Sequence, residues 1–510
     1  MVLQQDMPVP VWGTADPGEA VTVTLGTHCG KATAGADGKW TLKLAPISAS
    51  AQGMQMTVAG KNTVTFQDVL IGEVWVCSGQ SNMEFGLGGA HNADAVIPQA
   101  NDPQMRLFHV MNKTAHTPLS DVVGKWELSA PQTVGNFTAV GYFFGKELRT
   151  KLNRPMGLIE TCWGGTPAEA WTSLDGLKKE PALAHAVREW EQIDAGYQKA
   201  LAAFPALSSA YDAAIKDWNA KYRKDFDAAN TQWNQDATKA RAAHQPEPPR
   251  PVPPVAEPQR PQDPTGGPGE PTALYDGMIA PLQPYAIRGA IWYQGESNAG
   301  RAAEYSILFP RMITDWREKW DEGDFPFLFV QLAGFGTDDV GWPILRDSQA
   351  KTLSLPKTGM ATAVDIGLPD NIHPMDKLDV GKRLALAALH VAYGQHLAYS
   401  GPMIESVKRD GSALDVTFKH ARHGLEIGKS PWIGPGAVAL PMDHLVGFEV
   451  AGADGKWTAA DAKIDSGAVV VSSTAVPTPV EVRYDWRAYP EGNLYNADGL
   501  PAPPFHAKVE

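Results

Sequence analysis

The stretch Glu73-Val-Trp-Val-Cys-Ser-Gly-Gln-Ser-Asn-Met83 joins a run of apolar residues directly to a polar turn. An unbroken apolar run of this kind is typical of a strand that is buried on both faces of a parallel sheet. Gly79 allows a sharp turn after that strand, and Ser81 follows shortly behind it. A serine between a strand and a helix exposes its hydroxyl, and the N–H groups of the helix N-terminus favour developing negative charge. The stretch therefore predicts a sheet strand and makes Ser81 the candidate nucleophile, in preference to Ser78.

Further apolar runs with the character of buried strands follow along the chain, at residues 156–160, 289–293, 327–330 and 360–364. Helix-period stretches separate several of these runs. The clearest helix comes after the last one, where apolar residues step by 4, 3 and 4 through Val380, Leu384, Ala387 and Val391. Strands that alternate with helices predict an α/β fold with a parallel sheet covered on both faces. In such sheets the functional groups lie just beyond the carboxyl ends of the strands.

A second polar turn, Asp370-Asn-Ile-His373, precedes a proline and this last helix. An aspartate three residues before a histidine can turn back and accept a hydrogen bond from the imidazole Nδ1–H. That contact fixes the tautomer and leaves Nε2 free to take a proton from a serine. Asp370 and His373 are therefore the candidate acid and base.

Two more polar turns follow predicted strands. The turn Trp292-Tyr-Gln-Gly-Glu-Ser-Asn298 offers the amide of Gln294, the carboxylate of Glu296 and two aromatic side chains. In the turn Cys162-Trp-Gly-Gly-Thr166, the glycines can direct a backbone N–H into a pocket, and Trp163 and Trp171 have faces that could stack on a sugar. Four polar turns at the carboxyl ends of strands in one parallel sheet predict a single shared site.

The two ends of the chain have a different, all-β character. Alternating apolar and polar residues with turn signals predict a small β-sandwich-like module at the N-terminus and another β module at the C-terminus. The predicted organisation is an N-terminal β module, two halves of the α/β domain around an insertion, and a C-terminal β module, over residues 1–68, 69–173, 174–274, 275–400 and 401–510 respectively.

The insertion combines helical and proline-rich sequence. Apolar residues at helical spacing between Tyr211 and Trp233 predict one long helix, and an earlier run between Val187 and Phe204 predicts a second. We expect the two to form an antiparallel helical hairpin. The proline-rich residues 245–271 predict an extended strap without a core of its own. No catalytic or binding role is expected for this insertion.

Composition excludes several classes of function. The 510 residues carry a formal net charge of −13 and no Lys/Arg run, which argues against binding to nucleic acid or to an anionic membrane. The 3 cysteines, Cys29, Cys77 and Cys162, are too few for a disulfide framework and are not spaced as metal ligands. The longest apolar stretch, residues 325–335, is too short to span a bilayer. The first residues read as a strand, so we expect any export signal to lie outside this sequence.

The sequence resembles the bacterial sialate O-acetylesterase-like carbohydrate esterases of the SGNH hydrolase superfamily. The motifs that carry the resemblance are Ile71-Gly-Glu-Val-Trp-Val-Cys-Ser-Gly-Gln-Ser-Asn-Met-Glu84, Trp163-Gly-Gly-Thr-Pro167, Ile291-Trp-Tyr-Gln-Gly-Glu-Ser-Asn298 and Ile372-His-Pro374. The similarity extends to residues 1–4, 493–496 and 499–502 and is weakest in the helical insertion. The resemblance implies a flavodoxin-like three-layer α/β/α domain and a periplasmic or secreted enzyme, with no metal and no cofactor.

The resemblance also implies roles for individual residues. Ser81 matches the nucleophile and His373 the base, while Gly164 and Gln294 match oxyanion donors beside the Ser81 backbone N–H. Asp370 fits the Asp-x-x-His arrangement of the superfamily, and Glu296 is the alternative acid.

The implied reaction is hydrolysis of an O-acetyl ester on a sugar through an acyl-enzyme. The sugar is sialic acid in the first hypothesis and acetylated hemicellulose, such as xyloglucan or xylan, in the second. Two other classes stay open at this point. One is a non-catalytic carbohydrate-binding protein, and the other is a glycosidase that uses Glu296 with Glu84. The oligomeric state is not predicted.

Overall fold

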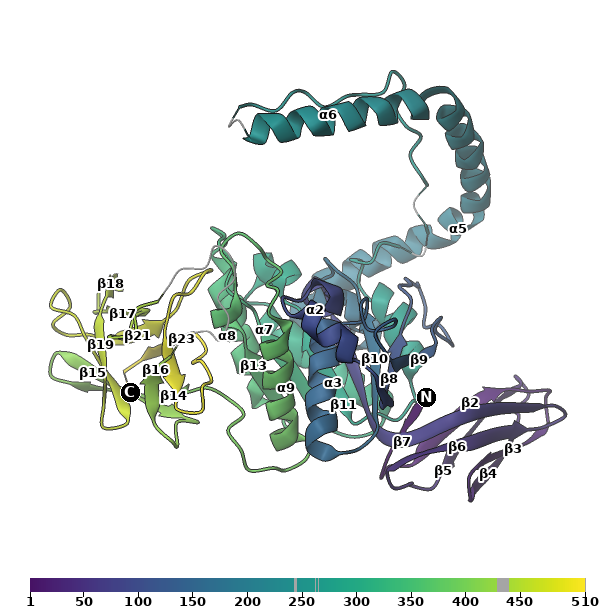
Figure 1. Cartoon of the computed structure of the whole chain (residues 1–510), viewed down its shortest axis with the longest axis horizontal. Coiled ribbons are helices and arrows are strands. Elements are labelled where there is room, and N and C mark those ends of the chain that lie inside the picture. Colours follow the sequence, from purple (N-terminus) through teal and green to yellow (C-terminus); the bar gives the residue numbers. More distant parts are fainter. Residues whose placement is uncertain (243–244, 262, 265, 429–439, 510) are drawn as a thin grey trace.

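The computed structural model describes residues 1–242, 245–261, 263–264, 266–428 and 440–509. A central α/β domain lies between two β modules, and a long helical arm projects from it (Figure 1). The predicted α/β class is confirmed. The central part is a mixed sheet with further sheets attached to it at the N-terminal side.

The central sheet has the strand order β13-β12-β11-β7-β10-β8-β9. Neighbours from β13 to β8 run parallel, and β9 pairs antiparallel with β8 at the edge. The strands are β7 (Thr63–Gly79), β8 (Asp102–His109), β9 (Trp126–Ser129), β10 (Met156–Cys162), β11 (Gly289–Tyr293), β12 (Phe327–Gln331) and β13 (Thr358–Thr362). Each of the five predicted buried runs therefore contributes a strand of this sheet, and β10, β11 and β12 are buried along their whole length.

Helices pack on both faces of the sheet. Phe329 of β12 contacts Phe309 of α7 (Tyr305–Trp320), with ring centroids 5.1 Å apart. On the opposite face, Trp75 of β7 contacts Phe144 of α3 (Ala139–Leu152) at 5.0 Å. The α3 helix lies beside α9 (Lys377–Val391), the helix predicted from its 4, 3, 4 spacing. Shorter helices complete the domain at α1 (Ser81–Glu84), α2 (Ala93–Val96), α4 (Leu174–Lys178) and α8 (Gly341–Lys351).

The N-terminal module is continuous with the central sheet. Strand β7 pairs antiparallel with β6 through its first half and parallel with β10 and β11 through its second half. It thus runs through the boundary predicted at residues 68 and 69. The remaining strands of the module are β1 (Val2–Gln4), β2 (Val9–Thr14), β3 (Ala20–Leu25), β4 (His28–Thr33), β5 (Lys39–Leu44) and β6 (Ser50–Ala59).

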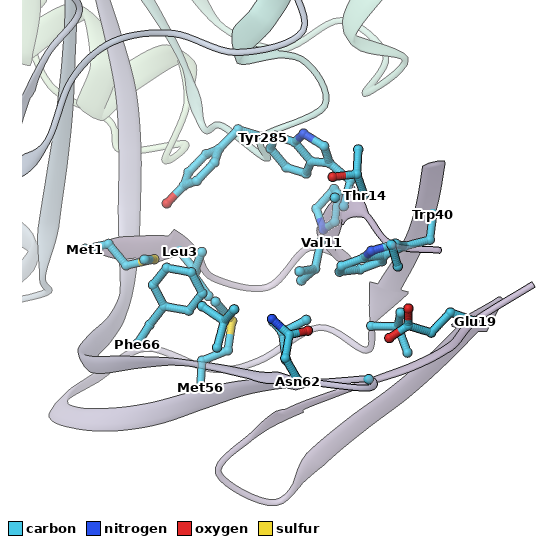
Figure 2. A pocket seen from close by; sticks show the side chains of 18 residues that line it. Met1, Leu3, Val11, Thr14, Glu19, Trp40, Met56, Asn62, Phe66 and Tyr285 are labelled. Carbon is cyan, nitrogen blue, oxygen red and sulfur yellow. The ribbon is translucent and has the colours of Figure 1, made fainter. Parts of the chain in front are cut away.

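A largely apolar cavity of about 350 Å³ lies in this module. Figure 2 shows Leu3, Val11 and Trp40 from the module around it, with Tyr285 of the central domain at its border. The phenol of Tyr285 donates a hydrogen bond of 2.5 Å to the carbonyl of Val2, which ties the module to the domain. None of the predicted site residues lines this cavity.

The C-terminal module contains two four-stranded sheets around its own apolar core. One sheet has the order β14-β15-β20-β19 and the other β18-β17-β21-β23, and β16 pairs with β22. The strands are β14 (Met403–Asp410), β15 (Ala413–Lys419), β16 (Leu425–Ile427), β17 (Phe448–Ala451), β18 (Trp457–Ala459), β19 (Asp461–Asp465), β20 (Ala468–Ser472), β21 (Glu481–Tyr484), β22 (Leu494–Asn496) and β23 (Phe505–Lys508).

The predicted antiparallel hairpin in the insertion is wrong. Helix α5 (Ala184–Trp218) passes through a π-helical turn, η5 (Asn219–Arg223), into α6 (Lys224–Ala242), so that the helices form one bent arm (Figure 1). The apolar stripe is covered by the proline-rich strap instead of by a second helix. The indole N–H of Trp218 donates to the carbonyl of Val255 at 2.8 Å, and that of Trp233 donates to Pro248 at 2.8 Å.

Candidate active site

The ends of three neighbouring strands meet at Gly79. This residue is the Cα partner of Cys162 at the end of β10 and of Tyr293 at the end of β11. Gly79 has a φ of 139°, and a Cβ atom there would lie 2.2 Å from the carbonyl oxygen of Tyr293, so only glycine fits. The polar turns that follow these strands are therefore gathered at one edge of the sheet, as the sequence predicted.

Ser81 and His373 are in direct contact. Ser81 begins α1 directly after the β7 turn, and His373 lies in the loop between the short helix η10 (Val364–Ile366) and α9. The distance between Ser81 Oγ and His373 Nε2 is 2.8 Å. Both residues are half-buried, so the pair is shielded but open to solvent. This geometry allows the imidazole to take the hydroxyl proton.

Asp370 does not contact the imidazole. It is exposed on the same loop, and within the described residues no hydrogen bond joins it to His373. The backbone N–H of His373 donates instead to Oδ1 of Asn371 at 2.9 Å. Burial and the neighbouring Lys377 lower the pKa of His373. The acid role of Asp370 stays a prediction.

The amide of Asn82 connects the two loops that carry Ser81 and His373. Its Nδ2 donates to the carbonyl of Ile372 at 3.0 Å and to Oε1 of Glu296 at 2.7 Å. Its Oδ1 accepts from the ammonium of Lys377 at 2.6 Å. Asn82 follows the serine and Ile372 precedes the histidine, so one side chain fixes the spacing of both.

Glu296 lies in the 3₁₀ turn η8 (Glu296–Arg301) and reaches this network, not the imidazole. Its Oε2 atom is buried and accepts no hydrogen bond from the described residues. Burial raises the pKa of Glu296, against the opposing effects of Asn82 and Lys377. Its contact with the dyad is therefore indirect, through Asn82.

Gly164 points its backbone N–H toward the nucleophile turn. The N–H donates to Oε2 of Glu84 at 2.7 Å, and a Cβ atom on Gly164 would lie 3.2 Å from Ser81 Cβ. The predicted oxyanion donor therefore lies beside Ser81. Its N–H is hydrogen-bonded to the carboxylate of Glu84.

Gln294 is fully buried, and both polar atoms of its side-chain amide are hydrogen-bonded. Its Nε2 donates to the carbonyl of Thr166 at 3.1 Å and to Oδ1 of Asn298 at 2.7 Å, and its Oε1 accepts from the Tyr305 hydroxyl at 2.8 Å. Both amide hydrogens are therefore used, one on the turn that contains Gly164 and the other on Asn298 of its own turn. The predicted role of Gln294 as a direct oxyanion donor stays a prediction.

The aromatic residues of the turns divide between core and site. Trp171 and Trp292 are completely buried and pack edge to face with centroids 6.0 Å apart, so neither can stack on a sugar. Trp163, next to Gly164, is half-buried. It is the tryptophan of these turns that can reach a ligand.

Three functional residues had no role in the sequence-based prediction of the dyad: Asn82, Glu84 and Lys377. The first two belong to the Ser81 motif, and Lys377 lies four positions after His373, at the start of α9. Their closeness in sequence to Ser81 and His373 was a signal that they could take part in the site. Their partners were not predictable because the contacts join segments that lie between 80 and 295 positions apart in the sequence.

Within the described ranges, no group of three or more His, Cys, Asp or Glu side chains is arranged to hold a metal ion. No described helix combines the length and the apolar character needed to cross a bilayer. The described cysteines Cys29, Cys77 and Cys162 are all free thiols.

Comparison with known proteins identifies close relatives along the entire chain. The chain is 28% identical to mouse (Mus musculus) sialate O-acetylesterase and 29% identical to the rat (Rattus norvegicus) enzyme. Each alignment covers 100% of this chain and 93% of the relative.

The crystal structure of a carbohydrate acetylesterase from Xanthomonas citri is similar over 100% of this chain and 97% of its own, with a TM-score of 0.76 and 34% identity. Residues 71–240 and 266–390 match the family described as "Carbohydrate esterase, sialic acid-specific acetylesterase". These ranges hold Ser81, Gly164 and His373. The chain therefore belongs to this family of carbohydrate esterases, which are carboxylic ester hydrolases.

Proposed function

We propose that this esterase removes O-acetyl groups from sugars, with Ser81 as the nucleophile and His373 as the general base. The 2.8 Å contact between Ser81 Oγ and His373 Nε2 carries the proposal, since it joins a hydroxyl to the group that can activate it. Helices on both faces of the parallel strands support the finer assignment to a flavodoxin-like three-layer SGNH domain. The resemblance supports a periplasmic or secreted location.

The reaction follows from this contact. Ser81 Oγ attacks the acetyl carbonyl carbon while His373 Nε2 takes the hydroxyl proton, which gives a tetrahedral intermediate. As the intermediate collapses, the imidazolium protonates the departing sugar oxygen. The acetyl group is left as an ester on Ser81. Water, deprotonated by the same imidazole, then attacks this ester and releases acetate.

The negative oxygen of the intermediate needs N–H donors. The Ser81 and Gly164 backbone N–H groups are the proposed pair, and removal of one such donor typically costs about 100- to 1000-fold in rate. In the present structure Glu84 accepts from Gly164. The substrate carbonyl must therefore replace the Glu84 carboxylate before the reaction.

Two residues are candidates for the acid that would complete a catalytic triad, Asp370 and Glu296. Asp370 is three residues from His373 in sequence and is exposed on the same loop. Glu296 is linked to the His373 loop through Asn82 and the Ile372 carbonyl. The Asn82 link favours Glu296 as an indirect support of the imidazole.

Two classes of acetylated sugar fit the relatives and the site. The named activity of the rodent enzymes supports a sialic acid ester. A specific observation favours a neutral sugar such as acetylated hemicellulose. Lys377 and Glu296 are both bonded to Asn82, while the Glu84 carboxylate lies on the Gly164 N–H beside Ser81. A sugar carboxylate would be repelled by Glu84.

Release of acetate from a panel of acetylated sialosides, xylan and xyloglucan fragments tests the function and selects the sugar. Ser81→Ala is expected to lose activity by about 10⁴-fold or more while keeping the wild-type melting temperature. A Ser81→Ala variant with wild-type turnover would remove Ser81 as the nucleophile. Release of free sugar without acetate would instead indicate a glycosidase.

A further inference from the structure

Lys377 is a buried cation that the reaction above does not use. Its side chain is completely buried at the start of α9, and its ammonium lies 4.8 Å from the centre of the Phe85 ring and 5.4 Å from that of Tyr293. Its hydrogen bond goes to Oδ1 of Asn82 at 2.6 Å. Burying an ammonium is costly unless it has partners, so the rings and the amide must compensate for lost water.

The orientation of the Asn82 amide is fixed by its partners. Lys377 can only donate, so it must face Oδ1, and the Ile372 carbonyl can only accept, so it must face Nδ2. A reversed amide would place two donors together and two acceptors together. The ammonium therefore determines which way Asn82 points, and Asn82 in turn joins the residue after Ser81 to the residue before His373.

The ammonium also acts on the imidazole through space. Its positive charge opposes protonation of His373. Other titratable groups near this loop include Glu84 on α1, Glu296 on η8, Asp370 and Asp376 on the loop itself, and His91, whose Nδ1 lies 3.4 Å from the Met375 carbonyl oxygen. Burial lowers the pKa of Lys377 to about 7, while Glu296 and Asp376 act to raise it. Lys377 therefore carries its positive charge at pH values below about 7. In this range His373 has to stay neutral to act as a base.

We propose that Lys377 is a positioning residue of the reaction: its ammonium, fixed on Asn82, holds the Ser81 turn against the His373 loop and keeps the imidazole in its neutral, proton-accepting form. The inference rests on the esterase function proposed above. In this proposal Lys377 contributes to the reaction without contacting the substrate.

The pH profile of kcat/KM for a chromogenic acetate ester tests this role. Lys377→Met removes the charge, so protonation of His373 becomes easier and the acidic limb is expected to move up by about half a unit to one unit. Lys377→Arg keeps a charge and is expected to leave the limb near its wild-type position. The matched control is Lys382→Met, which removes an exposed charge from the same helix and should leave the profile unchanged.

The outcomes are distinct. A Lys377→Met variant with lower kcat but an unshifted acidic limb would show a merely structural lysine and overturn the proposal. If Lys377→Met does not fold by circular dichroism, Lys377→Gln gives the same neutral readout, since its amide can donate to Asn82. Failure of the esterase function itself would appear differently, as a wild-type enzyme that releases no acetate.

A second test measures whether the effects of substituting Lys377 and Asn82 on kcat depend on each other. Asn82→Ala is expected to lower kcat by about tenfold or more with a smaller change in KM, because the bound substrate meets a misplaced dyad. Combined with Lys377→Met, the loss in kcat should be smaller than the product of the two single losses. Losses that multiply would mean that Lys377 and Asn82 act independently, which contradicts the proposal.

Discussion

At the scale of single residues, the feature with the clearest consequence is the Glu84 carboxylate on the Gly164 N–H. A carboxylate is a strong acceptor, and a negative charge beside a developing oxyanion raises the barrier to its formation. If Gly164 donates to the oxyanion as proposed, the substrate carbonyl has to displace this side chain in each turnover. Glu84 therefore acts against the reaction in the position that the structure shows.

Glu84→Gln is expected to raise kcat/KM for a small acetate ester by about 3- to 10-fold. The neutral amide keeps the shape of the side chain but binds the N–H less strongly and carries no charge. Steady-state kinetics with the chromogenic ester measures the change. A loss of activity in this variant would show that Glu84 assists the substrate instead of competing with it.

The pH dependence of the wild-type enzyme follows from the pKa of His373. Because burial and Lys377 lower this pKa, the imidazole stays neutral to a lower pH than an ordinary histidine. A general base is active when neutral, so kcat/KM should fall only below the ordinary value of 6.5 as the pH decreases. An acidic limb centred above that value would show that the pKa of His373 is not lowered in the enzyme.

Ser81 and His373 were predictable because both follow from a rule of position. Ser81 lies just after a buried parallel strand that ends at Gly79, and polar turns at the ends of such strands converge. Gln294 shows where this rule stops, since its position was predicted but its amide is consumed by Thr166 and Asn298. The direction of a side chain depends on packing that no local pattern records.

Among the secondary-structure elements, the helical arm formed by α5, η5 and α6 also shows that a local sequence pattern does not record packing. The spacing of apolar residues correctly predicted helical structure over residues 187–204 and 211–233, but not that α5 runs without a break from the first range into the second. Periodicity identifies the face that is buried and not the segment that buries it. Here the strap covers Trp218 and Trp233, and a π-helical turn connects the helices without reversing the chain.

Trp218→Phe is expected to loosen the strap without affecting catalysis. The substitution keeps an aromatic ring against Phe226 but removes the hydrogen bond to the Val255 carbonyl, a loss of about 1 kcal/mol. Limited proteolysis should cut residues 245–261 faster, and kcat should not change because the arm projects away from the central sheet (Figure 1). Unchanged cleavage would show that the bond does not hold the strap.

At the scale of the whole molecule, the alternation of strands and helices was sufficient to predict the α/β class. The junctions between its parts were not predictable. Strand β7 belongs to both the N-terminal module and the central sheet, so no linker marks that boundary. Arg346 of α8, a fully buried arginine, helps to attach the C-terminal module, and no sequence pattern indicated this role.

Arg346 joins the two parts through backbone carbonyls. Its guanidinium donates to Leu332 and Ala333 in the central domain and to Arg487 and Ala488 in the C-terminal module. Arg346→Met would remove these four hydrogen bonds, although the Ala333 carbonyl would keep the Trp342 indole N–H and the Ala488 carbonyl would keep the Phe335 N–H. The substitution is expected to cost about 3 kcal/mol of stability. Thermal unfolding measures the loss. Lys351→Met, which removes an exposed cation from the same helix, is the control and should change stability by less than about 0.5 kcal/mol.

The central claim is that Ser81, activated by His373, carries the acyl group, and covalent labelling tests it most directly. The enzyme is treated with a serine-reactive fluorophosphonate and mapped by peptide mass spectrometry. One adduct is expected, on Ser81, formed in step with the loss of esterase activity and absent from His373→Ala. Full inactivation with an adduct on another residue, and with Ser81 unmodified, would contradict it.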